Sequence, residues 1–365
     1  NRISGEACTL DNVSFPAGTV TASAQLASEI SASFQGGFEF TGEIRTAKGV
    51  WSEIASLNTG RSNPFIAGNQ NASLVAGGAN SPASPYYTDN SEEFNGSSWT
   101  EGNNMITAGR QGHASAGTQN AAVFAGGYIH PAAVACTEEY NGSSYSTGGA
   151  LNVARWNGFG AGTQTSALSV GGQTPSVQDK TELYDGNAFS QLAVNIGGTS
   201  NITSGDGGSS NDALAIGDSP ATTNVRQWDG ITWFGVADTV EDDTNRAATG
   251  TTTDFIAYGG SESAVQTTEQ FDGTSWSVGG DYPIATYRAE AGSRGGGSSA
   301  WGVGGVGPAP TTHRTDAYHY NSFYTTGSFG RVEADDVQIA GNSQLVVSQS
   351  LGIPVYTSNT GIVSS

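Results

Sequence analysis

The sequence is poor in positive charge. Its 365 residues include 13 Lys and Arg against 33 Asp and Glu, which gives a net charge of −20, and Lys48 and Lys180 are the two lysines. Proteins that bind nucleic acid through its phosphates need clusters of Lys and Arg, so nucleic acid is excluded as a partner. We expect the acidity to keep the protein soluble in a salty medium, and the alternative is a surface that recruits divalent cations.

Long apolar runs and paired cysteines are also lacking. No apolar stretch approaches the roughly 20 residues that a membrane-spanning helix needs, so no membrane span is predicted. Cys8 and Cys136 are the two cysteines, and they lie in different regions of the chain. They therefore predict no disulfide framework.

The sequence does contain an internal repeat. A short apolar run ends in a glycine pair, and an acidic-aromatic segment, a turn and a second aromatic residue follow it. The closing aromatics are spaced 43 to 48 residues apart, and a period of this length built from strand-like pieces indicates a propeller or a solenoid. The pairs are Gly77-Gly78, Gly126-Gly127, Gly171-Gly172, Gly217-Asp218 (a degraded copy), Gly259-Gly260 and Gly304-Gly305. The closing aromatics are Trp51, Trp99, Tyr145, Phe189, Trp233 and Trp276.

One unit of the repeat predicts four short antiparallel strands. Residues 110–117 are rich in Gly and Ala, which suits a crowded inner strand, and the apolar residues 120–125 follow a tight turn. Residues 137–140 alternate and end at Asn141-Gly142, and Asn-Gly is a strong signal for a two-residue hairpin. The fourth strand begins at the closing aromatic. Four antiparallel strands make a propeller blade, so the expected fold is an all-β, six-bladed propeller.

The glycine pair, the aromatic after it and the second aromatic five residues later resemble the kelch repeat over residues 51–324. Copy four departs from this pattern, because Gly217-Asp218 replaces the pair and no Arg precedes the first strand. Copy six departs from it as well, because Asn321-Ser322 stands where the Gly turn is expected. The resemblance implies a kelch-like propeller with irregular fourth and sixth blades.

Short sequences within the units also resemble those of kelch-type propellers of marine bacteriophages, especially cyanophages. The phrases are Asn-Gly-Ser-Ser-Trp, Ala-Gly-Thr-Gln-Thr and the segments at residues 38–44 and 326–334, which look like sequences that flank propellers in virion proteins. This resemblance implies a structural protein of the virion, such as a tail-fibre, capsid-fibre or decoration component.

The expected organisation has three parts: an N-terminal anchoring segment over 1–49, the propeller over 50–324 and a C-terminal extended or β segment over 325–365. Leu26, Ile30 and Phe34 form one apolar stripe on a predicted short helix at 22–34. Neither flank has enough apolar mass for a core of its own. We expect both to pack against other virion proteins in an oligomeric assembly.

Two sets of residues are candidates for binding. An Arg precedes the first strand of most units, and a ring of arginines on one face would suit an anionic glycan. The alternative, which the one-per-blade placement favours, is that each Arg bonds backbone carbonyls or a carboxylate of its own blade. Glu241, Asp242 and Asp243 form an acidic run that would suit calcium or, more simply, a solvated loop. The candidate arginines are Arg61, Arg110, Arg155, Arg246 and Arg288.

No nucleophile–base constellation or phosphate-cradling motif occurs, so we expect no enzyme activity and no cofactor other than the calcium just considered. The first hypothesis is a virion protein that displays a propeller to a host-surface glycan or receptor. The alternatives are a secreted or surface-bound glycan-active enzyme on the same scaffold, and a bacterial cell-surface or filament protein. The fold alone does not separate these functions.

Two structural expectations follow from the repeat. Six glycine pairs predict six blades, which leaves the strand at Val50-Trp51-Ser52 without a blade of its own. We predict that it pairs with the last blade beside residues 314–324 and closes the ring, because closure removes exposed strand edges. We also predict that Trp99, Trp233 and Trp276 are largely buried between blades.

Overall fold

The computed structural model describes residues 49–80, 86–107, 109–197, 204–217, 222–242, 245–260, 265–286, 290–292, 297–306, 317–321, 355–356 and 362–363. The chain divides into two compact units, one of residues 1–47 and 323–365 and the other of Lys48–Ser322. In the first unit the described residues are the antiparallel pair β29 (Val355–Tyr356) and β30 (Ile362–Val363). The helix predicted over 22–34 lies outside the described residues.

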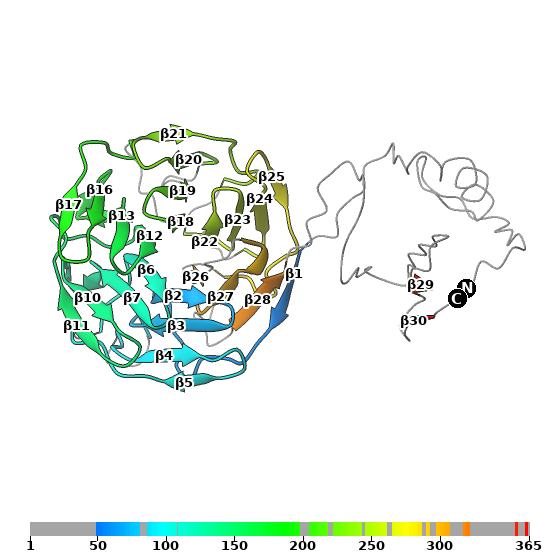
Figure 1. The fold of residues 1–365 in the computed structure, drawn as a ribbon, viewed down its shortest axis with the longest axis horizontal. Coiled ribbons are helices and arrows are strands. Elements are labelled where there is room, and N and C mark those ends of the chain that lie inside the picture. The colour runs from blue at the N-terminus through cyan, green and yellow to red at the C-terminus, as the bar shows by residue number, and fades with distance from the viewer. Residues whose placement is uncertain are drawn as a thin grey trace, which may run out of the picture. The chain divides into compact units, whose positions relative to one another are not determined.

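The second unit is an all-β propeller of six four-stranded antiparallel sheets (Figure 1). A 3-10 turn, η1 (Gly297–Ser299), is its one described helical element. The first three blades are: blade 1, β2 (Phe65–Asn69), β3 (Ala72–Ala76), β4 (Ser91–Phe94), β5 (Trp99–Glu101); blade 2, β6 (Ala114–Thr118), β7 (Ala121–Ala125), β10 (Thr137–Tyr140), β11 (Tyr145–Gly148); blade 3, β12 (Phe159–Thr163), β13 (Ser166–Val170), β16 (Thr181–Tyr184), β17 (Phe189–Gln191). The last three are: blade 4, β18 (Ser204–Ser209), β19 (Asp212–Ile216), β20 (Val225–Trp228), β21 (Trp233–Gly235); blade 5, β22 (Ala247–Thr251), β23 (Asp254–Tyr258), β24 (Thr268–Phe271), β25 (Trp276–Val278); blade 6, β26 (Glu290–Gly292), β27 (Trp301–Val303), β28 (Ala317–Asn321), β1 (Val50–Glu53).

The innermost strands of successive blades contact one another all the way round the ring, from β2 through β6, β12, β18, β22 and β26 back to β2. This crowding explains why the inner strands are rich in glycine. A Cβ on Gly160 would lie 2.6 Å from the backbone nitrogen of Ser115 in the neighbouring blade, which no side chain tolerates. Apolar residues of the first three strands of each blade then fill the space between blades. Phe65 and Phe124, from blades 1 and 2, stack at 5.2 Å.

Because the strands of a blade alternate in direction, the propeller has two chemically different faces. The first-to-second and third-to-fourth strand turns, including Asn95-Gly96 and Asn141-Gly142, lie on one side, which we call the turn face. The glycine pairs, the connections from second to third strand and the connections between blades lie on the other side, which we call the loop face. In blades 2 and 3 the second-to-third connections contain small hairpins: β8 (Tyr128–Ile129) with β9 (Ala132–Ala133), and β14 (Gln173–Thr174) with β15 (Ser176–Val177).

The glycine pairs of blades 1, 2, 5 and 6 each tie their blade to the next on the loop face. The second glycine of the pair donates its N–H to the carbonyl that begins the following blade, as Gly78 does to Arg110 at 2.8 Å and Gly127 to Arg155 at 2.8 Å. Gly127 has φ +116°, and a Cβ there would lie 2.3 Å from the carbonyl oxygen of Gln111. Only glycine fits such a position.

The predicted ring closure is confirmed. β1 pairs antiparallel with β28, with Val50 opposite Asn321 and Trp51 opposite Tyr320, so the N-terminal strand supplies the outermost strand of blade 6. The other blades join their third and fourth strands by an Asn-Gly or Asp-Gly turn at this point. In blade 6 the two ends of the propeller chain meet there instead, which explains why copy six lacks the Gly turn.

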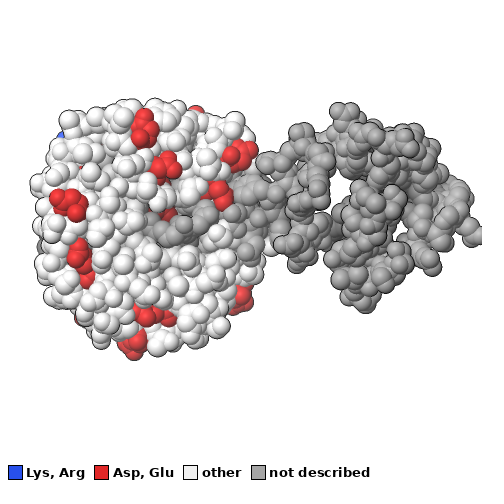
Figure 2. Space-filling model, viewed as in Figure 1, with Lys and Arg blue, Asp and Glu red and all other residues white. Residues whose placement is uncertain are grey.

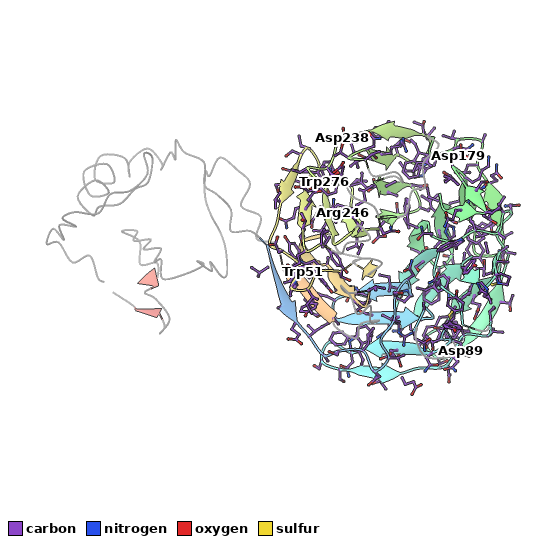
Figure 3. The ribbon with its side chains drawn as sticks, turned by 180° about the vertical axis from the view of Figure 1, so that it is seen from behind. Trp51, Asp89, Asp179, Asp238, Arg246 and Trp276 are labelled. Atoms are coloured by element: carbon purple, nitrogen blue, oxygen red, sulfur yellow. The ribbon has the colours of Figure 1, made fainter. Side chains whose placement is uncertain are left out.

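The prediction of buried tryptophans holds for two of the three residues. Trp99 and Trp276 are 7% and 8% exposed, and their indole N–H groups donate to the carbonyls of Ala55 and Ala237. Trp233 is only half-buried, which corrects the prediction. Trp228, opposite it on the third strand of blade 4, is 2% exposed and lies 5.4 Å away, as Phe94 and Phe271 lie buried opposite Trp99 and Trp276. Figure 3 shows Trp51 and Trp276 in their blades, with Arg246 nearer the middle of the disc than Trp276.

Candidate functional site

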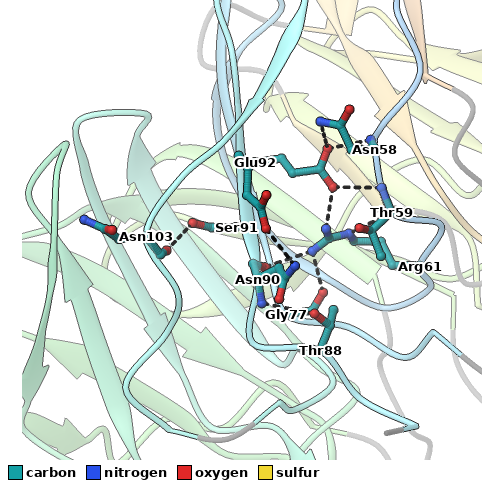
Figure 4. Close-up of polar contacts among 10 residues, drawn as sticks. Asn58, Thr59, Arg61, Gly77, Thr88, Asn90, Ser91, Glu92 and Asn103 are labelled. Carbon is teal, nitrogen blue, oxygen red and sulfur yellow. Dashed lines mark hydrogen bonds and ion pairs between the residues drawn. The ribbon is translucent and has the colours of Figure 1, made fainter. Parts of the chain in front are cut away.

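The sequence directs attention to the arginines that precede the first strand of most units, and the structure places the four described ones inside the blades. Arg61 is fully buried, and its guanidinium forms an ion pair of 2.5 Å with Glu92 of β4 (Figure 4). The same guanidinium donates to the carbonyls of Gly77 and Asn90, both at 3.0 Å. Glu92 in turn accepts the backbone N–H groups of Asn58 and Thr59. Arg61 therefore fastens the loop that enters blade 1 to the third strand of that blade.

The same arrangement recurs in three other blades. Each Arg is buried and lies beside the second residue of the third strand of its own blade, which is a buried Glu that also accepts backbone N–H groups. We call these four ion pairs the arginine locks. Removal from water lowers the pKa of Arg155 to about 10, while the nearby Glu182 opposes that shift. Besides Arg61–Glu92 they are Arg110–Glu138 at 3.3 Å, Arg155–Glu182 at 3.2 Å and Arg246–Glu269 at 2.8 Å.

This placement bears on the proposed arginine ring. Arg61, Arg110 and Arg155 have no exposed surface, so none of them reaches a ligand without a rearrangement of its blade. Their N–H groups donate to carbonyl and carboxylate oxygens of the protein itself, which is the structural alternative that the one-per-blade placement favours. Arg288 lies outside the described residues.

The acidic run 241–243 does not assemble a metal centre in the part of the chain that the structure describes. Glu241 and Asp242 are exposed, the backbone N–H of Glu241 donates to Glu269 at 2.7 Å, and Asp243 lies outside the described residues. Among the described residues, no group of three His, Cys, Asp or Glu side chains is placed to hold a metal ion. Figure 2 shows separate acidic patches spread over one face of the propeller, rather than one acidic centre.

One histidine belongs to the same buried framework. His113 lies between blades 2 and 3, where its Nδ1 accepts the N–H of Gly158 at 3.0 Å and its Nε2 lies 2.9 Å from Ser169 Oγ. Burial, with a smaller contribution from the charge of Arg155, holds the pKa of His113 well below its usual 6.5. His113 is therefore neutral and structural.

A group of residues that the sequence analysis did not single out lies on the loop face. Tyr87 of blade 1, Tyr128 and His130 of blade 2, and Trp156 at the start of blade 3 contact one another ring to ring, and we call them the aromatic row. The ring centroids of Tyr87 and Tyr128 are 6.3 Å apart, those of Tyr128 and Trp156 are 5.0 Å apart, and those of Tyr128 and His130 are 6.2 Å apart. The available signal was positional: Tyr128 directly follows a glycine pair and Trp156 directly follows a lock arginine.

Comparison with known proteins adds no family to these observations: no model of a known protein family matches the chain, and no curated protein matches it significantly. Across the described residues, no helix has the length and apolar character needed to cross a membrane. The site must therefore be judged on its own geometry.

Proposed function

We propose that the chain is a non-enzymatic structural protein that displays a kelch-like propeller for binding, as a tail-fibre, capsid-fibre or decoration component of a bacteriophage virion. The β-propeller supports the display role, since its loops are carried on a rigid closed ring. The phage assignment rests on the resemblance of the repeat phrases to phage propellers.

The observation that carries the proposal is the position of the two chain ends within the propeller. Val50 and Asn321 are paired residues, and they occupy the place of the Asn-Gly turn, so the chain enters and leaves the disc on the turn face. The loop face, with its hairpins β8–β9 and β14–β15, lies on the opposite side of the disc. A protein attached through residues 1–49 and 325–365 would thus leave its loop face free for a host-surface glycan or receptor.

The buried charges fit the same role. The four arginine locks place their guanidinium and carboxylate groups in the blades, where they hold loops in position. Charged groups used in this way support a rigid platform, because they fix the loops that enter the blades to strands of the ring.

Mass spectrometry of purified virions tests the proposal. We expect the chain at a fixed stoichiometry in intact particles, and its recovery only from the secreted fraction or cell envelope would favour the surface or enzyme alternatives. The anchoring role has its own measurement, in which light scattering compares residues 50–324 with the full chain. The proposal predicts that the full chain associates and that residues 50–324 do not. It is contradicted if both proteins are well-folded monomers and the flanks of the full chain resist protease.

A further inference from the structure

The aromatic row has the properties of a built surface site. Its three largest rings, Tyr87, Tyr128 and Trp156, are half-buried, and His130 is exposed. The planes of Tyr128 and Trp156 are inclined by 40°, whereas those of Tyr87 and Tyr128 are inclined by 84°. The row crosses from blade 1 to blade 3 along the loop face, with Tyr128 at its centre and Tyr87 and Trp156 on either side.

The backbone holds Tyr128 and Trp156 in place. Tyr128 pairs with Gln111 through hydrogen bonds of 3.1 Å in both directions, and Trp156 pairs with Gln173 at 3.2 and 2.8 Å. Opposed residues of such antiparallel pairs project to the same side, so each ring has an amide side chain as its neighbour. Gly127 further ties the two blades together through its N–H bond to Arg155. Rings held in this way lose little freedom when a ligand binds.

The stretches of sequence that carry the row are uncharged, in a chain that is otherwise strongly acidic. The stretches 62–88, 111–137 and 156–178 contain no Asp, Glu, Lys or Arg, although the chain has 33 acidic residues. The corresponding strands of blades 4 and 5 do carry acids, namely Asp206, Asp212 and Asp254. The row of blades 1 to 3 therefore stands on uncharged stretches, and the nearest charges in sequence are Asp89, two residues after Tyr87, and the ion pair of Asp179 with Lys180 at the end of the third stretch.

We propose that the aromatic row binds a neutral, hexose-based polysaccharide. A pyranose ring has a face of C–H bonds with partial positive charge, which matches the negative face of an aromatic ring. Its hydroxyl groups need donors and acceptors at the edge of that face, and the amide of Gln111, the residue paired with Tyr128, is of this kind. The lack of Arg and Lys along these stretches argues against an anionic glycan as the ligand. An extended chain of sugars matches a row that crosses three blades.

This inference rests on the proposed display function and specifies its ligand, but the two fail separately. A virion component that binds no neutral glycan would retain the display function and lose this site. A protein that binds neutral glycan through the row and is absent from virions would retain the site and lose the phage assignment.

Affinity electrophoresis of the full chain tests the site, with gels that contain hydroxyethyl cellulose, laminarin or galactomannan, and with alginate as the anionic comparison. We expect retardation by at least one neutral polymer and none by alginate. Trp156→Ala and Tyr128→Ala should each weaken binding about tenfold, as truncation of a large aromatic anchor does. His130→Ala, at an exposed position, should give a smaller loss without any effect on folding.

The matched control is Phe234→Ala, which removes an aromatic side chain that is 41% exposed on the outer strand of blade 4, away from the row. It should bind like the parent, and thermal melts of all variants separate loss of binding from loss of fold. If Trp156→Ala does not fold, His130→Ala and Phe234→Ala still decide the outcome. The proposal is overturned if no neutral polymer retards the parent, if alginate alone does, or if the row variants that fold bind as well as Phe234→Ala.

Discussion

Blades 1 to 3 and blades 4 to 6 have the same strand order but are held together by different side chains. Between the early blades, Gln119 and Gln164 on the first turns of blades 2 and 3 donate to backbone carbonyls of the preceding blade at 2.7 to 3.1 Å. At the same position blade 4 uses Ser210, whose hydroxyl lies 2.7 Å from that of Ser166, and blade 5 uses Thr252, which donates to Asp212 at 2.9 Å. The contact is kept while its chemistry changes.

Paired substitutions show the same principle at the outer contacts. Tyr140 and Tyr184 donate their hydroxyl groups to Glu93 and Glu139 of the preceding blade, the second at 2.7 Å. At the next junction Leu183 replaces the glutamate and Trp228 replaces the tyrosine, and the two side chains belong to one apolar cluster. A donor and its acceptor disappear together, which avoids an unpaired buried polar group.

The arginine locks divide the blades in another way. Blade 4 has Arg226 at the strand position that Glu holds in the locked blades, and blade 6 has Tyr318 there. Both blades therefore lack the buried carboxylate of the lock, although they retain the fold. An arginine lock therefore stabilises the blade that contains it, whereas the ring as a whole is held by backbone hydrogen bonds and apolar packing.

The largest loss of stability is expected when one arginine lock is removed. Arg110→Met should lower the free energy of unfolding by about 3–5 kcal/mol, because it leaves Glu138 buried without its partner. Urea denaturation at pH 7 measures the change. Arg226→Met, at a half-buried site in blade 4, is the matched control and should cost about 1 kcal/mol or less.

The double variant Arg110→Met with Glu138→Leu sharpens the result, since replacing both partners by apolar residues is often close to neutral. It should recover most of the lost stability. A double variant that is less stable than Arg110→Met would show that the carboxylate contributes mainly through the backbone N–H groups of Ile106 and Thr107 that it accepts.

The tryptophans test the packing of the two halves. Trp99→Ala and Trp276→Ala should each cost about 3–5 kcal/mol, because a large buried side chain leaves a cavity that the blades cannot fill. Trp233→Ala should cost clearly less, since its ring is half-buried. Thermal melts of the three variants give the order, and equal losses would contradict the difference between the blades.

The outer hydroxyl–carboxylate contacts predict a smaller effect. Tyr184→Phe should cost about 1.5–3 kcal/mol, the range for a hydrogen bond to a charged group, because it leaves Glu139 without that donor. A double-mutant cycle with Glu139→Leu should show strong coupling between the two positions. The apolar pair of Leu183 and Trp228 at the next junction provides the comparison, and there Leu183→Ala should lose stability independently of salt.

The smallest effect is expected from a fall in pH, which acts on two histidines. Burial lowers the pKa of His113 far below 6.5 and also lowers that of His319 in blade 6. Above about pH 6.5 both residues are neutral whether the chain is folded or unfolded, and stability is constant. Below that value the unfolded chain binds the protons first, so the free energy of unfolding falls, by about 1.4 kcal/mol per pH unit for each histidine at most.

Variants of the two histidines show how much each half of the ring contributes to this loss of stability in acid. Chemical denaturation between pH 6.5 and 5 should show a shallower slope in His113→Gln, which cannot take up that proton. His319→Gln should change the slope less, because His319 is half-buried while His113 is 5% exposed. Identical slopes in the parent and His113→Gln would contradict the structural assignment of His113.

The features that could be predicted from sequence are those in which one residue type has a local physical cause. The glycine pairs, with positive φ and close backbone contacts, marked the blades, and Asn-Gly marked the hairpins. The pairing of Val50 with Asn321 could also be predicted, because counting left one strand unassigned. The lesser burial of Trp233 could not be predicted, because Trp99, Trp233 and Trp276 occupy the same repeat position and each stands opposite a buried aromatic of the third strand.

The candidate site was less accessible to sequence reasoning. The sequence around Arg61 and its counterparts does not show whether the side chain faces solvent or a buried carboxylate. Only the position of the partner Glu92 in the fold distinguishes an exposed arginine from a buried one. The aromatic row is assembled from three blades, so Tyr87, Tyr128 and Trp156 share no motif. Their proximity follows from the angular spacing of the blades, which the repeat period does not contain.

The closure of blade 6 also has a mechanical consequence. Because Val50 and Asn321 are paired, a force that pulls on both flanks acts on the disc at a single point of its rim. Such a force opens the contact of β1 with β28 from that end, one residue pair after another, instead of shearing all four pairs at once. Under such a load the outermost strand of blade 6 peels away first, while the other five blades carry no tension.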